Sequence, residues 1–396
     1  MTFSRDVVVI GGCGHVGLPL GLAFASRGLD VALYDINEDA VATVNGGTMP
    51  FAEDGADPVL KAVIGNRLVA TTDPSVLSSA EHVVVVIGTP VDEHLNPDPQ
   101  AVPRAFQRLL PHLVAGQLVV LRSTLYPGVT ALVEKVAAAA ELDVDVAFCP
   151  ERIAEGRAMT ELFELPQIVA SRDQRGFDRA EKLFRVLTND IVQLEPEEAE
   201  LAKLFTNTWR YIKFATANQL YMIANDFGLD YERIRSAIAY DYPRAADLPK
   251  AGFAAGPCLF KDTMQLAAFN NNNFMLGHAS MMVNEGLPLY VVARIEDSYD
   301  LSTMTVGILG MAFKAESDDI RSSLSYKLRR ILRFRAADVL CTDPYVAADP
   351  DLTPLDEVLE KADLLVVGTP HAAYAGLKPS QPVIDIWNLF GEGVSV

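Results

Sequence analysis

Glycines at positions 12, 14 and 17 constrain this chain more than any other feature of its sequence. They form the pattern Gly-x-Gly-x-x-Gly, which directly follows the apolar run Val7–Ile10 and opens a stretch with helical periodicity, Val16–Ser26. In such a strand–turn–helix unit, Gly12 permits the tight turn, Gly14 lets a diphosphate approach the backbone, and Gly17 lets the helix pack closely on the strand. The context therefore predicts a dinucleotide-binding α/β domain rather than an unrelated glycine-rich turn.

The kind of dinucleotide follows from an acidic residue at the end of the next predicted strand. Asp35 follows Val31–Tyr34 at about the 20-residue spacing that places a carboxylate on the ribose hydroxyls. A carboxylate at this position repels the 2′-phosphate of NADP, so we expect NAD. His15 and Val16 stand at the start of the predicted helix and complete the expected cofactor-binding turn, whereas Cys13 is a spacer.

The first half of the chain alternates β-branched runs with helical stretches such as Gln100–Leu113, which is typical of a parallel doubly wound sheet. The predicted strands are Asp6–Ile10, Val31–Tyr34, Leu68–Thr71, His82–Ile87, Leu118–Leu121 and Val144–Phe148, and Asp190–Leu194 closes the domain. We therefore expect a first domain over residues 1–195.

The pattern changes after Pro196, because about a hundred residues follow without a β-rich run. The predicted helices are Glu197–Phe227, Tyr231–Tyr240, Asp262–Phe269 and His278–Ser298, and they define a central domain over 196–300. A second strand series predicts a Rossmann-like domain over 301–396, with strands Met304–Leu309, Val339–Thr342, Leu364–Val367 and Val383–Ile386. The fold class is α/β, with two Rossmann-like doubly wound domains joined by a long-helix region. The apolar periodicity of the first long helix exceeds what small neighbouring domains can cover, so we predict a homodimer built on it.

Charge and cysteine usage narrow the range of functions. A formal net charge of −19 disfavours nucleic acid and anionic membranes as partners. The short N-terminal apolar run is no signal peptide and no stretch approaches a membrane span, so we expect a cytoplasmic protein. The four cysteines form no Cys-x-x-Cys or Cys/His cluster, so we expect reduced thiols, no disulfide and no metal site.

One cysteine stands in a distinctive place. Cys258 lies in the sequence GFAAGPCLFKD, on a Gly/Pro turn just before a predicted helix. The positive end of a helix favours the thiolate, which makes this thiol a candidate nucleophile. Taken alone, the position favours a buried, inert thiol over a nucleophile, and a buried, inert thiol is also how we interpret Cys149 and Cys341.

The order of motifs goes further, because the chain resembles the UDP-glucose/GDP-mannose dehydrogenase family over essentially its whole length. The resemblance rests on GGCGHVGLPL, VIGTPV around Thr89, RSTLYPGVT around Thr124, CPERIAEG around Glu151, ELAKLFTNTWRYIKFATANQL around Lys203, GFAAGPCLFKD and LGMAFKAESDDIR. It implies an N-terminal domain that binds NAD, central helices that form a dimer core, and a C-terminal domain that closes over a nucleotide-sugar.

The resemblance also implies roles for residues at matching positions. Cys258 would be the nucleophile, Lys203 and Asn207 would stabilise oxyanions, and Asp262 would act as acid/base partner with Lys203 through water. Lys203 and Asn207 are four residues apart on one predicted helix and therefore share a face. Glu151 would orient or deprotonate the hydrolytic water. The alternative for Lys203 is a solvated charge on the helix surface. The alternative for Glu151 is an ordinary surface pair with Arg152.

The remaining implied site residues contact cofactor or substrate. Thr89 and Thr124 match cofactor-binding positions, and Thr124 matches a catalytic one as well. The implied nucleotide-sugar contacts are Glu151, Arg152, Lys203, Asn207, Arg244, Lys250, Gly256, Lys314 and Arg321, with Lys314 and Arg321 meeting the diphosphate or the sugar. Each of the four cations Arg244, Lys250, Lys314 and Arg321 is alternatively a solvated surface charge.

The implied reaction oxidises a sugar C6 alcohol to a carboxylate. This removes four electrons, so two NAD molecules are needed, with a thiohemiacetal and then a thioester formed on the cysteine. Arg152-Ile153 favours a UDP-N-acetylhexosamine, with UDP-glucose and GDP-mannose as alternatives, whereas Pro257 and Trp387 depart from the family pattern. A 3-hydroxyacid-type dehydrogenase, which performs one two-electron step, and a binding module without catalysis are the remaining hypotheses.

Overall fold

A computed structural model describes residues 3–89, 91–92, 94–254, 256–394 and 396. The chain divides into two compact units, Met1–Thr206 and Asn207–Val396. Among the helices that the structure describes, none combines the length and the apolar run that a bilayer crossing requires.

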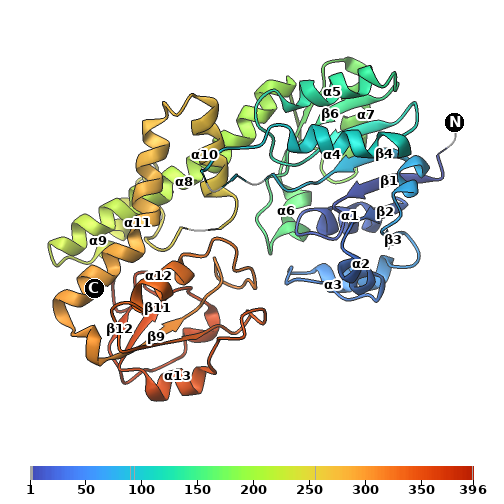
Figure 1. Cartoon of the computed structure of the whole chain (residues 1–396). Coiled ribbons are helices and arrows are strands. Elements are labelled where there is room, and N and C mark those ends of the chain that lie inside the picture. Colours follow the sequence, from blue (N-terminus) through green and yellow to red (C-terminus); the bar gives the residue numbers. More distant parts are fainter. Residues whose placement is uncertain (1–2, 90, 93, 255, 395) are drawn as a thin grey trace. The chain divides into compact units, whose positions relative to one another are not determined.

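The first unit is one sheet with helices on both faces (Figure 1). Its elements are β1 Arg5–Ile10, α1 Gly17–Ser26, β2 Val31–Tyr34, α2 Glu38–Asn45, α3 Ala56–Val63, β3 Leu68–Thr71, β4 Ala80–Val85, α4 Ala101–Leu109, β5 Leu118–Leu121, α5 Val129–Ala139, β6 Asp145–Phe148, α6 Ala158–Glu164, β7 Gln167–Ala170, α7 Gln174–Phe184 and β8 Ile191–Leu194. Strand β1 shows why the sheet is covered twice: Val7 and Val9 belong to one apolar cluster, and Val8 and Ile10 to another.

The strand order is β3-β2-β1-β4-β5-β6-β7-β8, and β1 to β6 are parallel, which confirms the predicted doubly wound architecture. Strand β7 was not predicted. It pairs antiparallel with β6 through Phe148 and Ala170, and β8 runs parallel to it, so the last two strands reverse the sheet direction. The sheet is therefore mixed at this edge, because β7 and β8 run opposite to β1 to β6.

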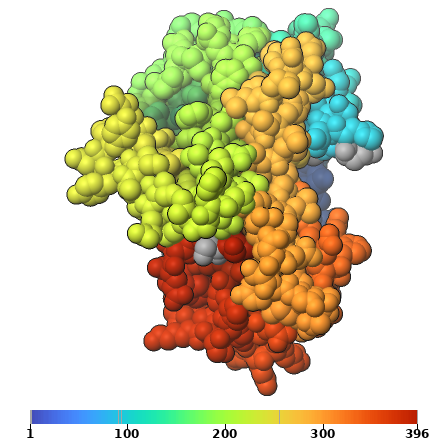
Figure 2. Space-filling view, turned by 90° about the vertical axis from the view of Figure 1, so that its left-hand side faces the viewer, coloured from blue at the N-terminus to red at the C-terminus, as the bar shows by residue number. Residues whose placement is uncertain are grey.

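Helix α8, Pro196–Asp226, is the predicted long helix. Its first turns are tied to the first unit by Glu200, which is fully buried and accepts hydrogen bonds from the amides of Gly128 and Thr130 and from the Thr130 hydroxyl. Further along, large apolar side chains at helical spacing are exposed on one side of the helix: Phe205, Trp209, Leu220 and Ile223, with Phe227 directly after the helix. Figure 2 shows the surface of this helix and of α9 in green to yellow.

The second unit combines helices with a small sheet. Its elements after α8 are α9 Tyr231–Ala239, α10 Leu259–Phe269, α11 Met275–Ser298, β9 Thr305–Leu309, α12 Leu324–Leu332, β10 Asp338–Thr342, α13 Leu355–Lys361, β11 Leu364–Val367 and β12 Val383–Ile384. The sheet is parallel with the order β10-β9-β11-β12, which confirms the second Rossmann-like unit. Residues of α8 and α11 share one apolar core with β9, so the helices and the sheet form a single body. The three-domain division stays a prediction.

Candidate active site

The glycine turn follows β1 and leads into α1, as predicted, but the strained position is Gly11. Gly11 has φ +72° and carries the tight turn, whereas Gly12 packs on Leu33, whose Cβ would lie 2.6 Å from an added Cβ. A Cβ at Gly17 would collide with the Gly11 carbonyl oxygen, so this glycine permits the close approach of helix and turn. At Gly14 the nearest atom to an added Cβ is 3.7 Å away, and the residue is exposed. The turn therefore presents open backbone at the start of a helix, which fits a diphosphate.

Asp35 lies beside this turn, at the carboxyl end of β2. Its carboxylate accepts hydrogen bonds from the amides of Cys13 (3.0 Å) and Asn37 (3.1 Å), and the residue is only half-buried, so ribose hydroxyls can still reach it. Burial, assisted by the Asp35 charge, raises the pKa of the Cys13 thiol to about 12, consistent with a spacer. His15 is half-buried and stacks on Phe51 with ring centroids 4.0 Å apart. These features fit NAD.

Two threonines meet at the carboxyl ends of neighbouring parallel strands. Thr89 follows β4 and Thr124 follows β5, and the Thr89 hydroxyl donates to the Thr124 carbonyl at 2.8 Å. Ser123 tightens the same junction by accepting from the Ile87 amide at 2.7 Å. The structure thus joins two residues that the sequence placed 35 positions apart, on the edge of the sheet where doubly wound folds bind ligands.

Glu151 does not form a surface pair with the Arg152 side chain. Its buried carboxylate pairs with Arg122, whose Nε and Nη2 lie 2.9 and 2.5 Å from Oε2, while the amides of Arg152 and Ile153 donate to Oε1 at 2.7 and 3.0 Å. Arg122 is also buried, and its guanidinium lies over the Phe184 ring. Sequence reasoning missed Arg122, although it directly follows a strand within the Thr124 motif.

The loop after β6 is fixed along its length by further carboxylates. Glu53 is buried and accepts from the amides of Gly156 and Ala158 at 2.8 and 2.7 Å, and Glu161 accepts from the Ala154 amide at 2.7 Å. The Arg152 guanidinium donates to the carbonyl of Pro166 ahead of β7, and burial lowers its pKa. The loop that carries Glu151 is therefore held by hydrogen bonds at several points along its length.

The pair Asn207 and Asp262 is the central contact of the second unit. Asn207 on α8 donates from Nδ2 to Asp262 Oδ2 at 2.5 Å, and both side chains are buried. Lys261 lies 3.0 Å from the other carboxylate oxygen. Lys203 is also buried, one turn before Asn207 on the same helix, so the alternative of a solvated surface charge is excluded.

Cys258 differs from every other thiol of the chain. It stands at the N-cap of α10, four residues before Asp262, and it is exposed, whereas the other three cysteines are buried. Burial raises the pKa to about 12 at Cys149 and to about 11 at Cys341, which makes both thiols unreactive. The position of Cys258 at a helix start, next to the buried Asp262, suits a nucleophile.

The turn before Cys258 touches the loop that follows β9. Gly256 has φ +104°, and a Cβ there would lie 2.6 Å from the Phe313 ring, while its amide approaches the Ser322 carbonyl at 3.4 Å. This loop carries Lys314, whose ammonium lies over the Phe313 ring, and the exposed Arg321. The structure therefore brings the loop of the predicted diphosphate-binding cations beside the nucleophile turn.

Two of the predicted substrate-binding cations, Arg321 and Arg244, contact neighbours within their own segments. Arg321 pairs with Asp319 two residues earlier. Arg244 lies over the Tyr242 ring and donates to its hydroxyl at 3.0 Å, and Lys250 is exposed just ahead of the cysteine turn. Their contact with a nucleotide-sugar stays a prediction.

The two Rossmann-like units, the first with a dinucleotide turn, fit the class of NAD-binding oxidoreductases. Comparison with known proteins gives the family. Residues 5–188 match the NAD binding domain of the UDP-glucose/GDP-mannose dehydrogenase family, residues 197–285 its central domain and residues 307–392 its UDP binding domain. The chain belongs to this family and is an NAD-dependent nucleotide-sugar dehydrogenase. This excludes the binding module without catalysis.

Individual relatives match over nearly the full length. A UDP-N-acetyl-D-mannosamine dehydrogenase of Pyrococcus horikoshii is 30% identical, with 93% of this chain and 90% of the relative covered. A solved UDP-D-ManNAc dehydrogenase from the same organism superimposes with a TM-score of 0.90 at 27% identity, covering 98% and 97% of the two chains. A UDP-glucose dehydrogenase from Pyrobaculum islandicum gives 0.90 at 26% identity, covering 99% and 96%.

Proposed function

We propose that this dehydrogenase oxidises the C6 alcohol of a UDP-N-acetylhexosamine to the carboxylate, in two hydride-transfer steps, through a thioester on Cys258. The observation that carries the proposal is the exposed Cys258 at the start of α10, one turn before the buried Asp262, which Asn207 holds at 2.5 Å. A nucleophile and a carboxylate one helical turn apart, with an amide donor from α8 on the carboxylate, suit covalent oxidation of an aldehyde.

The cofactor is held by the turn around Gly14 and by Asp35, with Thr89 and Thr124 at the neighbouring strand ends. Bound NAD accepts a hydride in each of the two oxidations. The backbone at Gly14 would hold the diphosphate and the Asp35 carboxylate would accept from the ribose hydroxyls, so the first unit would fix the hydride acceptor.

Asp262, Asn207 and Lys203 manage charge at the reacting carbon. As the first hydride leaves, Asp262 takes up the hydroxyl proton through water, and the aldehyde forms. The Cys258 thiolate then adds to the aldehyde carbon, and the oxyanion of the thiohemiacetal accepts hydrogen bonds from Lys203 and Asn207. Donors of this kind are worth about 3 kcal/mol each in comparable oxyanion sites. Loss of the second hydride leaves the thioester.

Water then attacks the thioester, which releases the carboxylate and returns the thiol. We assign Thr124 and Glu151 to this step, with Glu151 orienting the water rather than deprotonating it. Its two oxygens already accept four hydrogen bonds from Arg122 and the loop amides. A carboxylate whose two oxygens are used in this way fixes its loop and is suited to orienting a neighbouring water.

The substrate class is supported by the relatives and by the loop of Glu151. The Pyrococcus relative that matches over 93% of this chain is named for UDP-N-acetyl-D-mannosamine, and Arg152-Ile153 follows Glu151 here. UDP-glucose is the second candidate, because the Pyrobaculum UDP-glucose dehydrogenase superimposes equally well. We place the diphosphate on Lys314 and Arg321, whose loop touches the turn of Cys258.

A substrate screen tests the reaction. UDP-N-acetylmannosamine, UDP-N-acetylglucosamine, UDP-glucose and GDP-mannose are incubated with NAD while absorbance and product mass are followed. We expect two NADH per molecule of a UDP-N-acetylhexosamine. One NADH per sugar would indicate a two-electron reaction and would contradict the thioester. Efficient turnover of UDP-glucose alone would transfer the substrate assignment to the second candidate.

A cysteine comparison tests the covalent step. Cys258→Ser should lose steady turnover while still binding NAD and the nucleotide-sugar, and intact-protein mass spectrometry should detect an acyl adduct on the native enzyme during turnover. Cys341→Ser, at a buried thiol, is the control and should keep turnover per folded molecule. Production of two NADH per sugar at the native rate by Cys258→Ala would refute covalent catalysis at this residue.

A further inference from the structure

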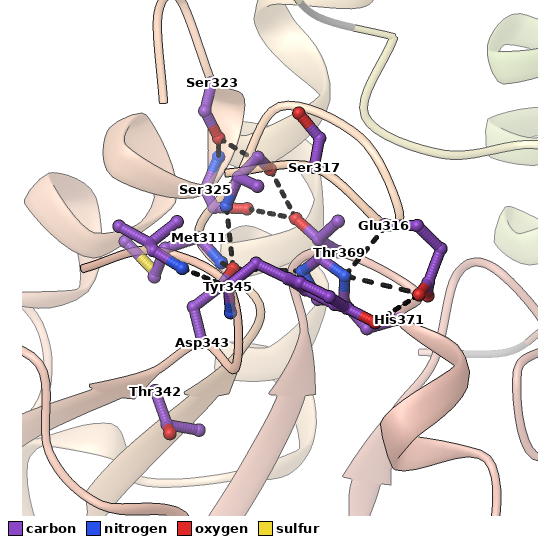
Figure 3. Close-up of polar contacts among 12 residues, drawn as sticks. Met311, Glu316, Ser317, Ser323, Ser325, Thr342, Asp343, Tyr345, Thr369 and His371 are labelled. Atoms are coloured by element: carbon purple, nitrogen blue, oxygen red, sulfur yellow. Dashed lines mark hydrogen bonds and ion pairs between the residues drawn. The ribbon is translucent and has the colours of Figure 1, made fainter. Parts of the chain in front are cut away.

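A polar network at the carboxyl ends of β9, β10 and β11 is used by none of the steps above (Figure 3). Its centre is His371, which is fully buried after β11. Its Nε2 lies 3.0 Å from Asp343 Oδ2, and its Nδ1 accepts the amide of Glu316 at 3.1 Å. Because Nδ1 accepts an N–H, the ring proton belongs on Nε2, which donates to Asp343.

Asp343 fixes the beginning of the loop that follows β9. The same Oδ2 that meets His371 also accepts the amides of Met311 and Ala312, at 2.6 and 2.9 Å. Thr369 adds to this anchor, because its hydroxyl donates to the Ala312 carbonyl at 2.5 Å. The backbone at 311–312 is therefore tied to the ends of both neighbouring strands.

A second anchor lies at Glu316. Its amide is held by His371, and its carboxylate accepts from the Ala372 amide at 2.7 Å and from the Tyr345 hydroxyl. Between the two anchors, three residues remain, Phe313 to Ala315. Lys314 is the middle one, and the Phe313 ring contacts the turn at Gly256, two residues before Cys258.

We propose that His371, with Asp343 and Tyr345, is a positioning residue for Lys314: by holding the backbone on both sides of this lysine, the network sets its ammonium for the diphosphate of the nucleotide-sugar. This inference rests on the proposed function, which places the diphosphate on Lys314. Anchors at 311–312 and 316 leave too little slack for the loop to reposition the lysine, so the lysine is preorganised at little entropic cost to binding.

Tyr345→Phe is the first variant, because it removes one hydroxyl from a side chain that is 38% exposed and therefore perturbs folding little. We expect the KM for the nucleotide-sugar and the Kd for UDP to rise about threefold, with the KM for NAD, kcat and the thermal midpoint unchanged. Tyr326→Phe is the matched control. It removes the hydroxyl with which Tyr326, on α12, donates to Asp349 at 2.9 Å. This contact lies outside the loop that carries Lys314, so the variant should leave UDP binding unchanged.

Lys314→Met separates this inference from the proposed function. We expect it to raise the Kd for UDP about tenfold or more, the size of a lost charge-assisted contact. If it has no effect, the assignment of the diphosphate to Lys314 fails. If it has the expected effect while Tyr345→Phe and His371→Asn bind UDP like the native enzyme, the positioning role is refuted and the assignment stands.

A double-mutant cycle and a histidine series complete the test. If Tyr345 acts through Lys314, Tyr345→Phe should have no further effect on UDP binding in the Lys314→Met background, whereas additive effects would overturn the inference. His371→Asn retains an acceptor near the Glu316 amide and should bind UDP more tightly than His371→Ala. Equal Kd values for these two variants, both measured on folded protein, would contradict the role of Nδ1.

Discussion

The buried ion pair of Arg122 and Glu151 allows a quantitative prediction for Glu151→Gln. The glutamine side chain has the same shape as glutamate, but one of its two terminal atoms is a nitrogen that donates. This NH2 group must face either the Arg122 guanidinium or the backbone amides of Arg152 and Ile153. Two hydrogen bonds are lost in either orientation, and the buried Arg122 charge loses its counter-ion. Removing one partner of a buried pair costs about 3 to 5 kcal/mol.

The effect should be visible in thermal unfolding of the first unit. In a domain of about 200 residues, each kcal/mol shifts the midpoint by about 2 to 4 °C, so we expect a decrease of about 10 °C followed by differential scanning calorimetry. Glu161→Gln is the control. Glu161 is part-buried, its Oε2 accepts the Ala154 amide at 2.7 Å, and its Oε1 lies 3.6 Å from Nε of the exposed Arg157. Loss of its negative charge should therefore lower the free energy of unfolding by about 1 kcal/mol or less.

Two results would refute this reasoning. A midpoint for Glu151→Gln within about 2 °C of the native enzyme would show that the carboxylate does not compensate the Arg122 charge. If the same variant hydrolysed the thioester at the native rate, Glu151 would have no part in this step, and our assignment of an orienting role would be wrong.

Three further predictions concern the cofactor, the assembly and the pH response. NAD should be preferred to NADP, and Asp35→Ala should mainly raise the KM for NAD; equal turnover with NADP would remove the ribose assignment. The exposed apolar side chains on α8 predict a homodimer, so sedimentation should give twice the 43.0 kDa mass of the chain. Ile223→Glu should yield monomers, whereas Phe334→Glu, a control at another exposed apolar residue, should not. A monomeric native chain at micromolar concentration would contradict this prediction. Burial alone would raise the pKa of the Asp343 carboxyl, but hydrogen bonds from His371 and the Ala312 and Met311 amides lower it below its usual range. Its stabilising contribution is therefore complete above about pH 4 and is lost as pH falls through the lowered pKa, so in acid titrations below about pH 4 unfolding of Asp343→Asn should depend less on pH than that of the native chain.

The parts of the fold that sequence predicts well are those with a local cause. Val31–Tyr34 and Leu118–Leu121 are short apolar runs bounded by polar residues, and both strands have the predicted bounds. Strand β7 was not predicted because Gln167–Ala170 is short and follows Pro166. Its direction relative to β6 is set by a single paired position. Strand direction at a sheet edge depends on tertiary pairing, which periodicity does not contain.

The same distinction holds for the site. The helical spacing of Lys203 and Asn207 could be read directly, and both side chains are buried. No local pattern, in contrast, joins Arg122 to Glu151 across 29 positions or Glu53 to the Gly156 amide across 103. The signal that could have found Asp343 was available, because it follows the strand Val339–Thr342 as Asp35 follows Val31–Tyr34.

These two acids show how one architecture serves two purposes. Asp35 accepts two backbone amides and keeps capacity for a ligand. Asp343, at the equivalent strand end, accepts four amides and the His371 ring. In the second sheet the acid at this position serves as internal scaffolding. A glycine-rich turn introduced after β9 would therefore not create a second dinucleotide site, because the hydrogen bonds that Asp343 makes within the protein would first have to be broken.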